Sequence, residues 1–155
     1  VKAAAPTPLS DRERAQRVAA AVVDPGEYLW SIRNEPRFDA TFASSPGGPV
    51  AYHAPCHLRA QGVGFKSRDL LRKIPGVQPK TVMECCGHDG TYAVKQEFHE
   101  FAVKIVKPVV KRVNEAQPDH YGSDCAMAGH HIGHVRADGS SPEHPITLLR
   151  KAYGV

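Results

Sequence analysis

The sequence has no apolar stretch long enough to cross a membrane. The longest candidates, residues 18–23 and 101–113, are too short or are interrupted by lysines at 104, 107 and 111. The chain also lacks a secretory signal with a basic start, an apolar run and a small-residue cleavage site. It does not begin with methionine and opens in a proline-containing segment, so we expect a fragment or a processed chain. These absences predict a protein without a membrane span.

Two further absences narrow the function. The basic residues are scattered, and no run of them is interleaved with stacking aromatic side chains, so the usual pattern of nucleic-acid binding is missing. The formal net charge of +4 is modest and favours an acidic partner or an anionic membrane surface. No flavin or nicotinamide motif is present. Chemistry that needs a flavin or a nicotinamide would therefore depend on a partner chain.

Length and composition are those of an ordinary globular protein. The 155 residues, 41% hydrophobic and 23% charged, suffice for one domain with a core. Four cysteines accompany nine histidines. An even number of cysteines allows disulfides, but the adjacent Cys85 and Cys86 rarely bridge each other because the ring would be strained. A cysteine pair beside glycine is more typical of a metal site than of a secreted disulfide scaffold.

Capping residues and hydrophobic periodicity predict helices first and then alternating strands and helices. Ser10 with Glu13 marks one helix start, and Asp24-Pro25 marks a second. A loop-like stretch, residues 34–49, leads to strands at 50–53, 81–84 and 120–124. Helices are predicted at 65–74, 91–114 and 145–153, and the histidine-rich segment after residue 125 is predicted as a loop. Pro108 should kink or split the longest helix.

This order indicates an α/β fold with a small, mostly parallel sheet flanked by helices and an N-terminal helical arm. We place the arm, or connector, at residues 1–49 and a cysteine-rich domain at residues 50–155. Each cysteine follows a predicted strand, and in an open parallel sheet ligands bind beyond the carboxyl ends of the strands. We therefore expect four cysteines to converge at one edge of the sheet: Cys56, Cys85, Cys86 and Cys125.

These four thiols have the chemistry of a metal site. Soft thiolates select iron–sulfur clusters, zinc or copper(I), and four of them satisfy the ligand count of a cluster. Their long separations along the chain fit a site assembled by the fold rather than a zinc finger. Two alternatives stay open. A single cysteine after a strand is often a small buried hydrophobe, and Cys125 with His130, His131 and His134 is a local group suited to zinc.

The segment after the cysteine pair carries further candidate residues. Gly87 and Gly90 permit positive φ and close backbone approach, so that amide N–H groups there could face cluster sulfurs. His88 is a candidate proton donor beside the redox centre; its alternative role is to cap the following helix together with Asp89 and Thr91. His53 and His57 flank Cys56 and are either supporting hydrogen-bond donors or plain loop residues.

Three motifs together resemble a known family. They are Tyr52-His53-Ala54-Pro55-Cys56-His57, Cys85-Cys86-Gly87-His88-Asp89-Gly90 and Ser123-Asp124-Cys125. They resemble the cysteine-rich CCG domain of Fe–S oxidoreductases, which occurs in the B subunit of heterodisulfide reductase, in the C subunit of anaerobic glycerol-3-phosphate dehydrogenase and in the iron–sulfur subunit of glycolate oxidase. The resemblance covers about residues 50–154. Members usually carry two such domains in tandem, and this chain is similar to the C-terminal copy.

The resemblance implies an iron–sulfur electron-transfer domain or subunit of an oxidoreductase complex, with a cluster of the 4Fe–4S type on Cys56, Cys85, Cys86 and Cys125. It implies a flavoprotein dehydrogenase or ferredoxin-like subunit as partner, a quinone or a thiol/disulfide as acceptor, and a cytoplasmic location with peripheral association at the inner membrane through the complex. The second hypothesis is a structural zinc-binding or partner-docking domain without redox activity.

The sequence departs from the family pattern at one position. The full pattern ends in Cys-x-x-Cys and provides five thiols for a noncubane cluster, but Ala128 stands where the fifth thiol would be. Four thiols still suffice for an ordinary cluster.

The N-terminal arm carries Val18, Val22 and Trp30, more apolar surface than a short helix pair can hide. We expect it to dock on a partner; the alternative is that it packs on its own domain.

Overall fold

Three short parallel strands form the centre of the structure, a computed structural model that describes residues 10–155. They are β1 (Val50–His53), β2 (Lys80–Val82) and β3 (His120–Ser123). The order is β2-β1-β3, and Tyr52 of β1 lies opposite Thr81 on one side and Gly122 on the other. All three strands therefore end at the same edge of the sheet. The α/β fold class expected from the sequence is confirmed.

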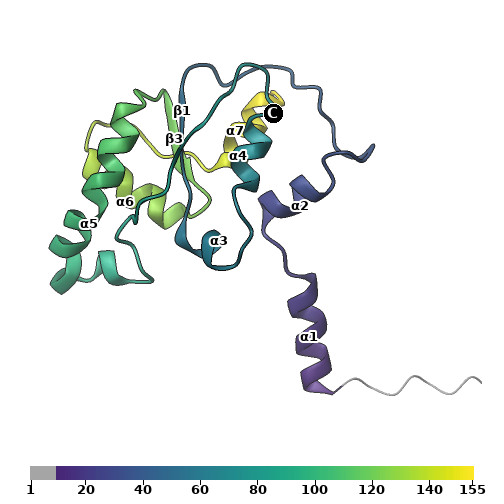
Figure 1. Ribbon diagram of the computed structural model, residues 1–155, viewed down its shortest axis with the longest axis horizontal. Coiled ribbons are helices and arrows are strands. Elements are labelled where there is room, and N and C mark those ends of the chain that lie inside the picture. The colour runs from purple at the N-terminus through teal and green to yellow at the C-terminus, as the bar shows by residue number, and fades with distance from the viewer. Residues whose placement is uncertain (1–9) are drawn as a thin grey trace, which may run out of the picture.

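Helices cover both faces of this sheet (Figure 1). On one face lie α5 (Gln96–Glu115) and α6 (Ala126–Arg136), and on the other lie α4 (Lys66–Leu71) and α7 (Pro145–Ala152). Side chains alternate along β1, so Ala51 belongs to the core under α5 and α6, whereas Val50 belongs to the core under α4 and α7. Two apolar cores thus fix the sheet from both sides.

Helix α5 runs without a break through Pro108, so the expected split does not occur. Pro108 is exposed, while Val106, Val109 and Val113 are fully buried on the opposite face. The hydrogen bond that proline removes lies on the solvent side, and burial of the valines holds the helix together. The helix begins later than expected because a separate 3-10 turn, Tyr92–Val94, precedes it.

The segment predicted as a loop after residue 125 is the helix α6, and a short helix α3 (Cys56–Ala60) also escaped prediction. Gly129 and Gly133 lower the helix propensity of α6. At Gly133 a Cβ atom would lie 2.7 Å from the hydroxyl oxygen of Tyr121. The glycine lets α6 pack closely on β3, so tertiary packing overrides its local preference.

The two helices of the N-terminal segment behave differently. Helix α1 (Asp11–Ala21) has the expected capping box between Ser10 and Glu13, but none of its residues is buried, and it projects away from the sheet (Figure 1). Helix α2 (Pro25–Ser31), capped by Asp24, packs against α4, where a Cβ on Gly26 would lie 2.3 Å from Ser67 Oγ. The boundary at residue 49 between the N-terminal arm and the cysteine-rich domain stays a prediction.

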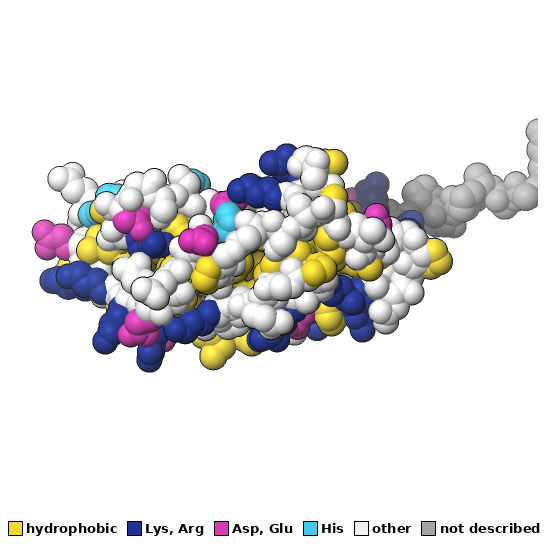
Figure 2. All heavy atoms as spheres, turned by 90° about the horizontal axis from the view of Figure 1, so that it is seen from above, with side chains coloured by type: hydrophobic (Ala, Val, Ile, Leu, Met, Phe, Trp, Pro, Cys, Tyr) yellow, Lys and Arg dark blue, Asp and Glu magenta, His cyan; other side chains and the backbone are white. Residues whose placement is uncertain are grey.

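Lysines and arginines lie in several places on the surface. Figure 2 shows some of them, with acidic side chains among them, at the end of the molecule that α5 occupies. Lys104, Lys107, Lys111 and Arg112 of α5 line a shallow hollow there together with Glu84. No helix of residues 10–155 is long and apolar enough to cross a membrane.

Candidate metal centre

The four cysteines lie in the three loops that leave the sheet at its carboxyl edge. Cys56 is the first residue of α3, Cys85 and Cys86 follow β2, and Cys125 is the N-cap of α6. Three of them line one cavity of about 360 Å³; its other lining residues are Pro55, His57, His88, Asp89, Gly90, Met127 and Ala128. We call this the thiol cavity. The structure brings the loops together as expected, and the role of the cysteines as ligands stays a prediction.

Cys85 does not line the thiol cavity, but it lies close to it. Burial raises the pKa of the Cys86 thiol, and the charges of Cys85, Cys56 and Cys125 raise it further. The charges of the other three cysteines therefore act on Cys86. Backbone amides offset part of this repulsion: the N–H of Gly87 donates to Cys85 Sγ at 3.4 Å, and a hydrogen bond from the backbone of His88 favours the Cys86 thiolate.

Gly87 makes the turn after the cysteine pair possible. Its φ is +69°, and a Cβ atom would lie 2.6 Å from the carbonyl oxygen of Ala102 in α5. Because Gly87 has no Cβ, the loop after the cysteine pair can lie close to the backbone of α5. Gly90 has a φ of +54° but open space around it, so it serves the backbone conformation beside the cavity. Their role in binding a cofactor stays a prediction.

His53 ties the ends of all three strands together. It is 1% exposed, and its Nδ1 lies 3.1 Å from Ser123 Oγ while its Nε2 lies 3.1 Å from the carbonyl oxygen of Glu84. A carbonyl only accepts, so Nε2 donates to Glu84 and Nδ1 accepts from the Ser123 hydroxyl. Ser123 Oγ accepts in turn from the N–H of Cys125 at 3.3 Å. His53 therefore positions the residues that precede Cys85 and Cys125.

The neighbouring residue on β1, Tyr52, also supports the loop that carries Cys125, from the opposite face of the sheet. Tyr52 donates its hydroxyl to Asp124 Oδ2 at 2.5 Å. Burial raises the pKa of the Asp124 carboxyl and also that of Tyr52. Asp124 directly precedes Cys125, so this bond holds the backbone that presents the thiol. On the α3 side, Arg59 Nη2 donates to Cys56 Sγ at 3.2 Å.

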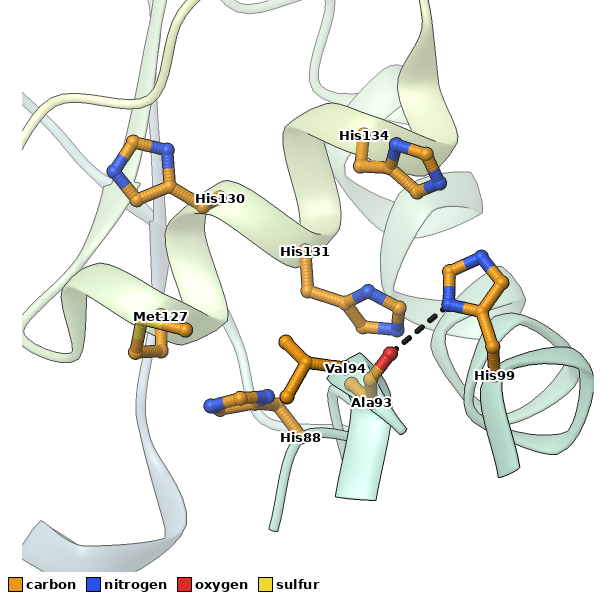
Figure 3. Close-up of a pocket in the computed structure, with 8 residues that line it drawn as sticks. All are labelled: His88, Ala93, Val94, His99, Met127, His130, His131 and His134. Carbon is orange, nitrogen blue, oxygen red and sulfur yellow. Dashed lines mark hydrogen bonds between the residues drawn. The ribbon is translucent and has the colours of Figure 1, made fainter. Parts of the chain in front are cut away.

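A second cavity adjoins the first. It also has a volume of about 360 Å³ and is lined by five histidines and three apolar residues: His88, His99, His130, His131, His134, Ala93, Val94 and Met127. We call this the histidine cavity (Figure 3). His88 and Met127 line both cavities. The alternative role of His88 as a helix cap is wrong, because Lys95 is the N-cap of α5 and no side chain caps that end.

The sequence did not reveal the histidine cavity, because it requires α6. His131 and His134 are three residues apart, a spacing that places both on one side of a helix. Their rings face that of His99 from α5, with centroid distances of 5.3 Å between His99 and His134 and 6.4 Å between His99 and His131. The three-residue spacing of these histidines was the one sign of a helix here. Gly129 and Gly133 made a helix look unfavourable, so the segment was predicted as a loop.

The zinc alternative finds no support in this arrangement. Cys125 lines the thiol cavity, whereas His130, His131 and His134 line the histidine cavity. Across residues 10–155, no three Cys, His, Asp or Glu side chains come close enough together to hold a single metal ion. An iron–sulfur cluster is larger and places its thiolates around several iron atoms.

Ala128 lies beside the thiols. It is 1% exposed, lines the thiol cavity and belongs to the same core as Cys86 and Cys125. The first turn of α6 therefore aims this side chain at the cavity. A thiol at this position would stand among the other four.

Several known proteins are similar to this chain. The C subunit of anaerobic glycerol-3-phosphate dehydrogenase from Escherichia coli is 36% identical over 105 residues, which are 66% of this chain and 26% of that protein. The B subunit of fumarate reductase (CoM/CoB) from Methanothermobacter marburgensis is 34% identical over 87 residues, 54% of this chain and 17% of that protein. Lactate utilization protein A of Geobacillus thermodenitrificans is 28% identical over 131 residues, 79% of this chain and 52% of that protein.

The chain thus spans about a quarter of the Escherichia coli relative and about half of the Geobacillus one. A family model described as a cysteine-rich domain, CCG, matches residues 50–132. This range includes all four cysteines and most of α6. The resemblance expected from the three motifs is confirmed. The chain belongs to the cysteine-rich CCG domain family.

Proposed function

We propose that this chain is an iron–sulfur electron-transfer domain or subunit of an oxidoreductase complex, with Cys56, Cys85, Cys86 and Cys125 as cluster ligands. The observation that carries the proposal is the meeting of three strand-end loops around the thiol cavity, which three of the thiols line and the fourth adjoins. Relatives whose names are those of dehydrogenase and reductase subunits support it.

The residues present fit such a group. The donor set consists of soft thiolates, which suit an iron–sulfur cluster, and this group would supply one-electron transfer. The amides of Gly87 and His88 point at cysteine sulfurs and stabilise negative charge there. Four thiols match a single ordinary 4Fe–4S cluster, and with Ala128 in place of a fifth thiol we propose that type rather than a noncubane one.

A partner has to deliver the electrons. The proposed donors are a flavoprotein dehydrogenase or a ferredoxin-like subunit, and the proposed acceptors are a quinone or a disulfide. The exposed Ile105 of α5 lies next to the loop after the cysteine pair, since its Cβ is 3.2 Å from where a Gly87 Cβ would be. Exposed Phe101 and Lys104 are near it on the same helix. This face is accessible to an acidic partner, and the complex would give the chain a peripheral place at the inner membrane.

Absorption spectroscopy on anaerobically purified protein tests the proposal. We expect a brown protein with broad visible absorption that bleaches on reduction, and with iron and acid-labile sulfide in stoichiometric amounts. The Cys86→Ala variant, measured in parallel, should lose most of its iron while keeping its far-UV circular dichroism. A colourless protein with one equivalent of zinc would refute the electron-transfer role and favour the structural zinc domain.

A further inference from the structure

Helix α5 presents a basic stripe to solvent. Lys104, Lys107 and Lys111 are exposed and follow one another at intervals of three and four residues, which places them on one side of the helix. They line the shallow hollow of about 660 Å³, whose other lining residues are Glu84, Pro108 and Arg112. Four of the six lining side chains are basic and one is acidic. The positive potential of this hollow attracts a negatively charged partner.

Exposed apolar side chains lie beside the basic stripe. Phe101 is 55% exposed and Ile105 is 42% exposed, and they are one turn apart on the neighbouring side of α5. The Nζ atom of Lys104 lies 5.5 Å from the centroid of the Phe101 ring, so the basic and apolar stripes are in contact. A surface of this composition suits a protein partner, because apolar contacts hold the two proteins together while charges orient them.

This face of α5 adjoins an exposed thiol. Glu84 lines the hollow, is bonded to Arg112 of α5 at 3.3 Å and directly precedes Cys85, which is exposed. On the other side of Cys85, the N–H of Gly87 donates to its Sγ atom, and Gly87 lies against the carbonyl of Ala102 in α5. Cys85 is therefore flanked by two residues that contact α5. A protein bound on this face comes close to the proposed centre at that thiol.

We propose that this face of α5, with Cys85 at its edge, is the docking surface for the electron donor and that the donor is an acidic, ferredoxin-like protein; this assignment rests on the proposed electron-transfer function. The donor loses one electron to the centre at the cysteines and is itself oxidised, and no bond forms or breaks and no proton moves. The basic stripe requires an acidic partner. Because the hollow is shallow, the donor's redox centre has to lie near the donor's own surface, as a ferredoxin-like cluster does.

An anionic membrane is the other negatively charged surface that a basic helix can bind. The structure favours a protein, because carboxylates interrupt the basic stripe. Arg112 is paired with both Glu84 and Glu115, at 3.3 and 3.1 Å, and Glu100 is exposed four residues before Lys104 on the same side of α5. These carboxylates would face lipid phosphates on a membrane. A protein can place its own basic groups opposite them.

Binding of a small acidic 2Fe–2S ferredoxin tests the assignment. Isothermal titration calorimetry with the anaerobically purified full chain measures the dissociation constant at two ionic strengths. We expect saturable binding that weakens at least tenfold between about 0.05 M and about 0.5 M salt, because salt screens exposed charges. Lys107→Glu/Lys111→Glu should weaken binding at low salt by about tenfold or more and should remove most of the salt dependence.

Three further variants separate charge from general effects. Lys73→Glu/Lys80→Glu makes the same change in net charge at two exposed lysines outside α5 and should bind like the unmodified chain. Lys107→Arg/Lys111→Arg keeps the charge and should also bind normally. Phe101→Ala should weaken binding by about two- to tenfold at both salt concentrations, because salt does not screen an apolar contact.

Chemical cross-linking locates the bound ferredoxin without relying on a cluster in this chain or on turnover. A carbodiimide joins a lysine amine directly to a carboxylate, so each cross-link reports a contact between the two proteins. We expect mass spectrometry to find cross-links at Lys104, Lys107 and Lys111 rather than at Lys73 and Lys80. No binding of the ferredoxin, equal weakening by the two charge-reversal variants, or cross-links confined to lysines outside α5 would overturn the inference.

Two other occupants of this face are tested with the same proteins. Co-sedimentation with vesicles of anionic phospholipid tests a membrane, and analytical ultracentrifugation of the chain alone tests a second copy. If Lys107→Glu/Lys111→Glu abolishes vesicle binding or self-association while ferredoxin binding persists, the face belongs to lipid or to another copy, and the inference is wrong. Ferredoxin binding that this variant loses, with no such effect on vesicles or self-association, supports it.

Iron and sulfide measured on each preparation separate this inference from the function on which it rests. A protein that carries a cluster but fails the binding and cross-linking tests contradicts the docking surface alone. A protein that lacks a cluster but binds the ferredoxin at the lysines of α5, with loss in the charge-reversal variant, contradicts the electron-transfer function and supports the docking surface.

Discussion

The ring of His53 is hydrogen-bonded to the side chain of Ser123, with 3.1 Å between Nδ1 and Oγ, and this bond joins the end of β1 to the end of β3. The same ring bonds to the carbonyl of Glu84 after β2. One buried side chain therefore holds three strand ends, immediately before the loops that carry the four thiols. The geometry of the metal centre depends on this bridge as much as on the cysteines.

We predict that Ser123→Ala loosens the thiol loops. The variant removes the hydroxyl that donates to His53 and accepts from the N–H of Cys125, and leaves a buried ring nitrogen without a partner. The free energy of unfolding should fall by roughly 1–3 kcal/mol, and bound iron should be lost faster to a chelator. Denaturant titration and iron release measure these effects. Ser140→Ala, at an exposed residue, serves as the control; equal behaviour of the two variants would count against the bridge.

The thiols and the histidines of α6 should differ in their effect on iron. We predict that Cys86→Ala harms cluster retention much more than His130→Ala, because Cys86 is 4% exposed beside the other thiols, whereas His130 is exposed and lines the other cavity. Iron content and visible absorption of the two purified variants measure the difference. Similar iron loss in both would mean that a histidine takes the place of a ligand and that the assigned set is wrong.

We predict that Ala128→Cys changes the cluster. The side chain at this position lines the thiol cavity, so a fifth thiol would stand among the other four and complete the Cys-x-x-Cys spacing. The electron paramagnetic resonance and visible spectra of the loaded variant should differ from those of the unmodified chain. Ala126→Cys adds a thiol on an exposed residue of the same helix and should leave the spectra unchanged. Spectra that are identical in all three proteins would show that the fifth position cannot reach the metal.

Buried histidines should make the fold sensitive to mild acid. Burial lowers the pKa of both His53 and His131 below the ordinary value of 6.5. As pH falls below about 6.5, the unfolded chain binds protons that the folded chain does not, so the free energy of unfolding falls, by at most about 1.4 kcal/mol per pH unit for each ring. Denaturant midpoints measured across this range should drop. In His131→Gln the dependence should be shallower, and an unchanged slope would exclude His131 as a contributor.

Helix α1 should serve partner binding rather than stability. It buries no residue, whereas Leu29, Trp30 and Ile32 of the next segment pack on the core. Removing residues 1–21 should leave the absorption spectrum intact and weaken co-purification with a flavoprotein or ferredoxin-like partner. Removing residues 1–33 should also lower stability, because it uncovers that core. Undiminished partner binding by the shorter truncation would exclude α1 as the docking element.

Local sequence determined most of the elements and the family. The capping residues Ser10 and Asp24 start helices where expected, and the strands and the last helix lie within a few residues of their predicted positions. The cysteines could be assigned to one edge because the carboxyl ends of parallel strands must meet there. These features depend on neighbouring residues or on strand order, and both can be read along the chain.

Tertiary structure alone decided the rest. Gly129 and Gly133 disfavour a helix locally, yet α6 forms because a residue without a Cβ lets it lie against Tyr121 and Pro142. Only that helix brings His131 and His134 to His99, so the histidine cavity could not be predicted from spacing along the chain. His53 was a residue of uncertain role in the sequence, and its bridge depends on the side-by-side placement of three strands. Contacts between distant segments are set by the packing of the whole core, which no local pattern encodes.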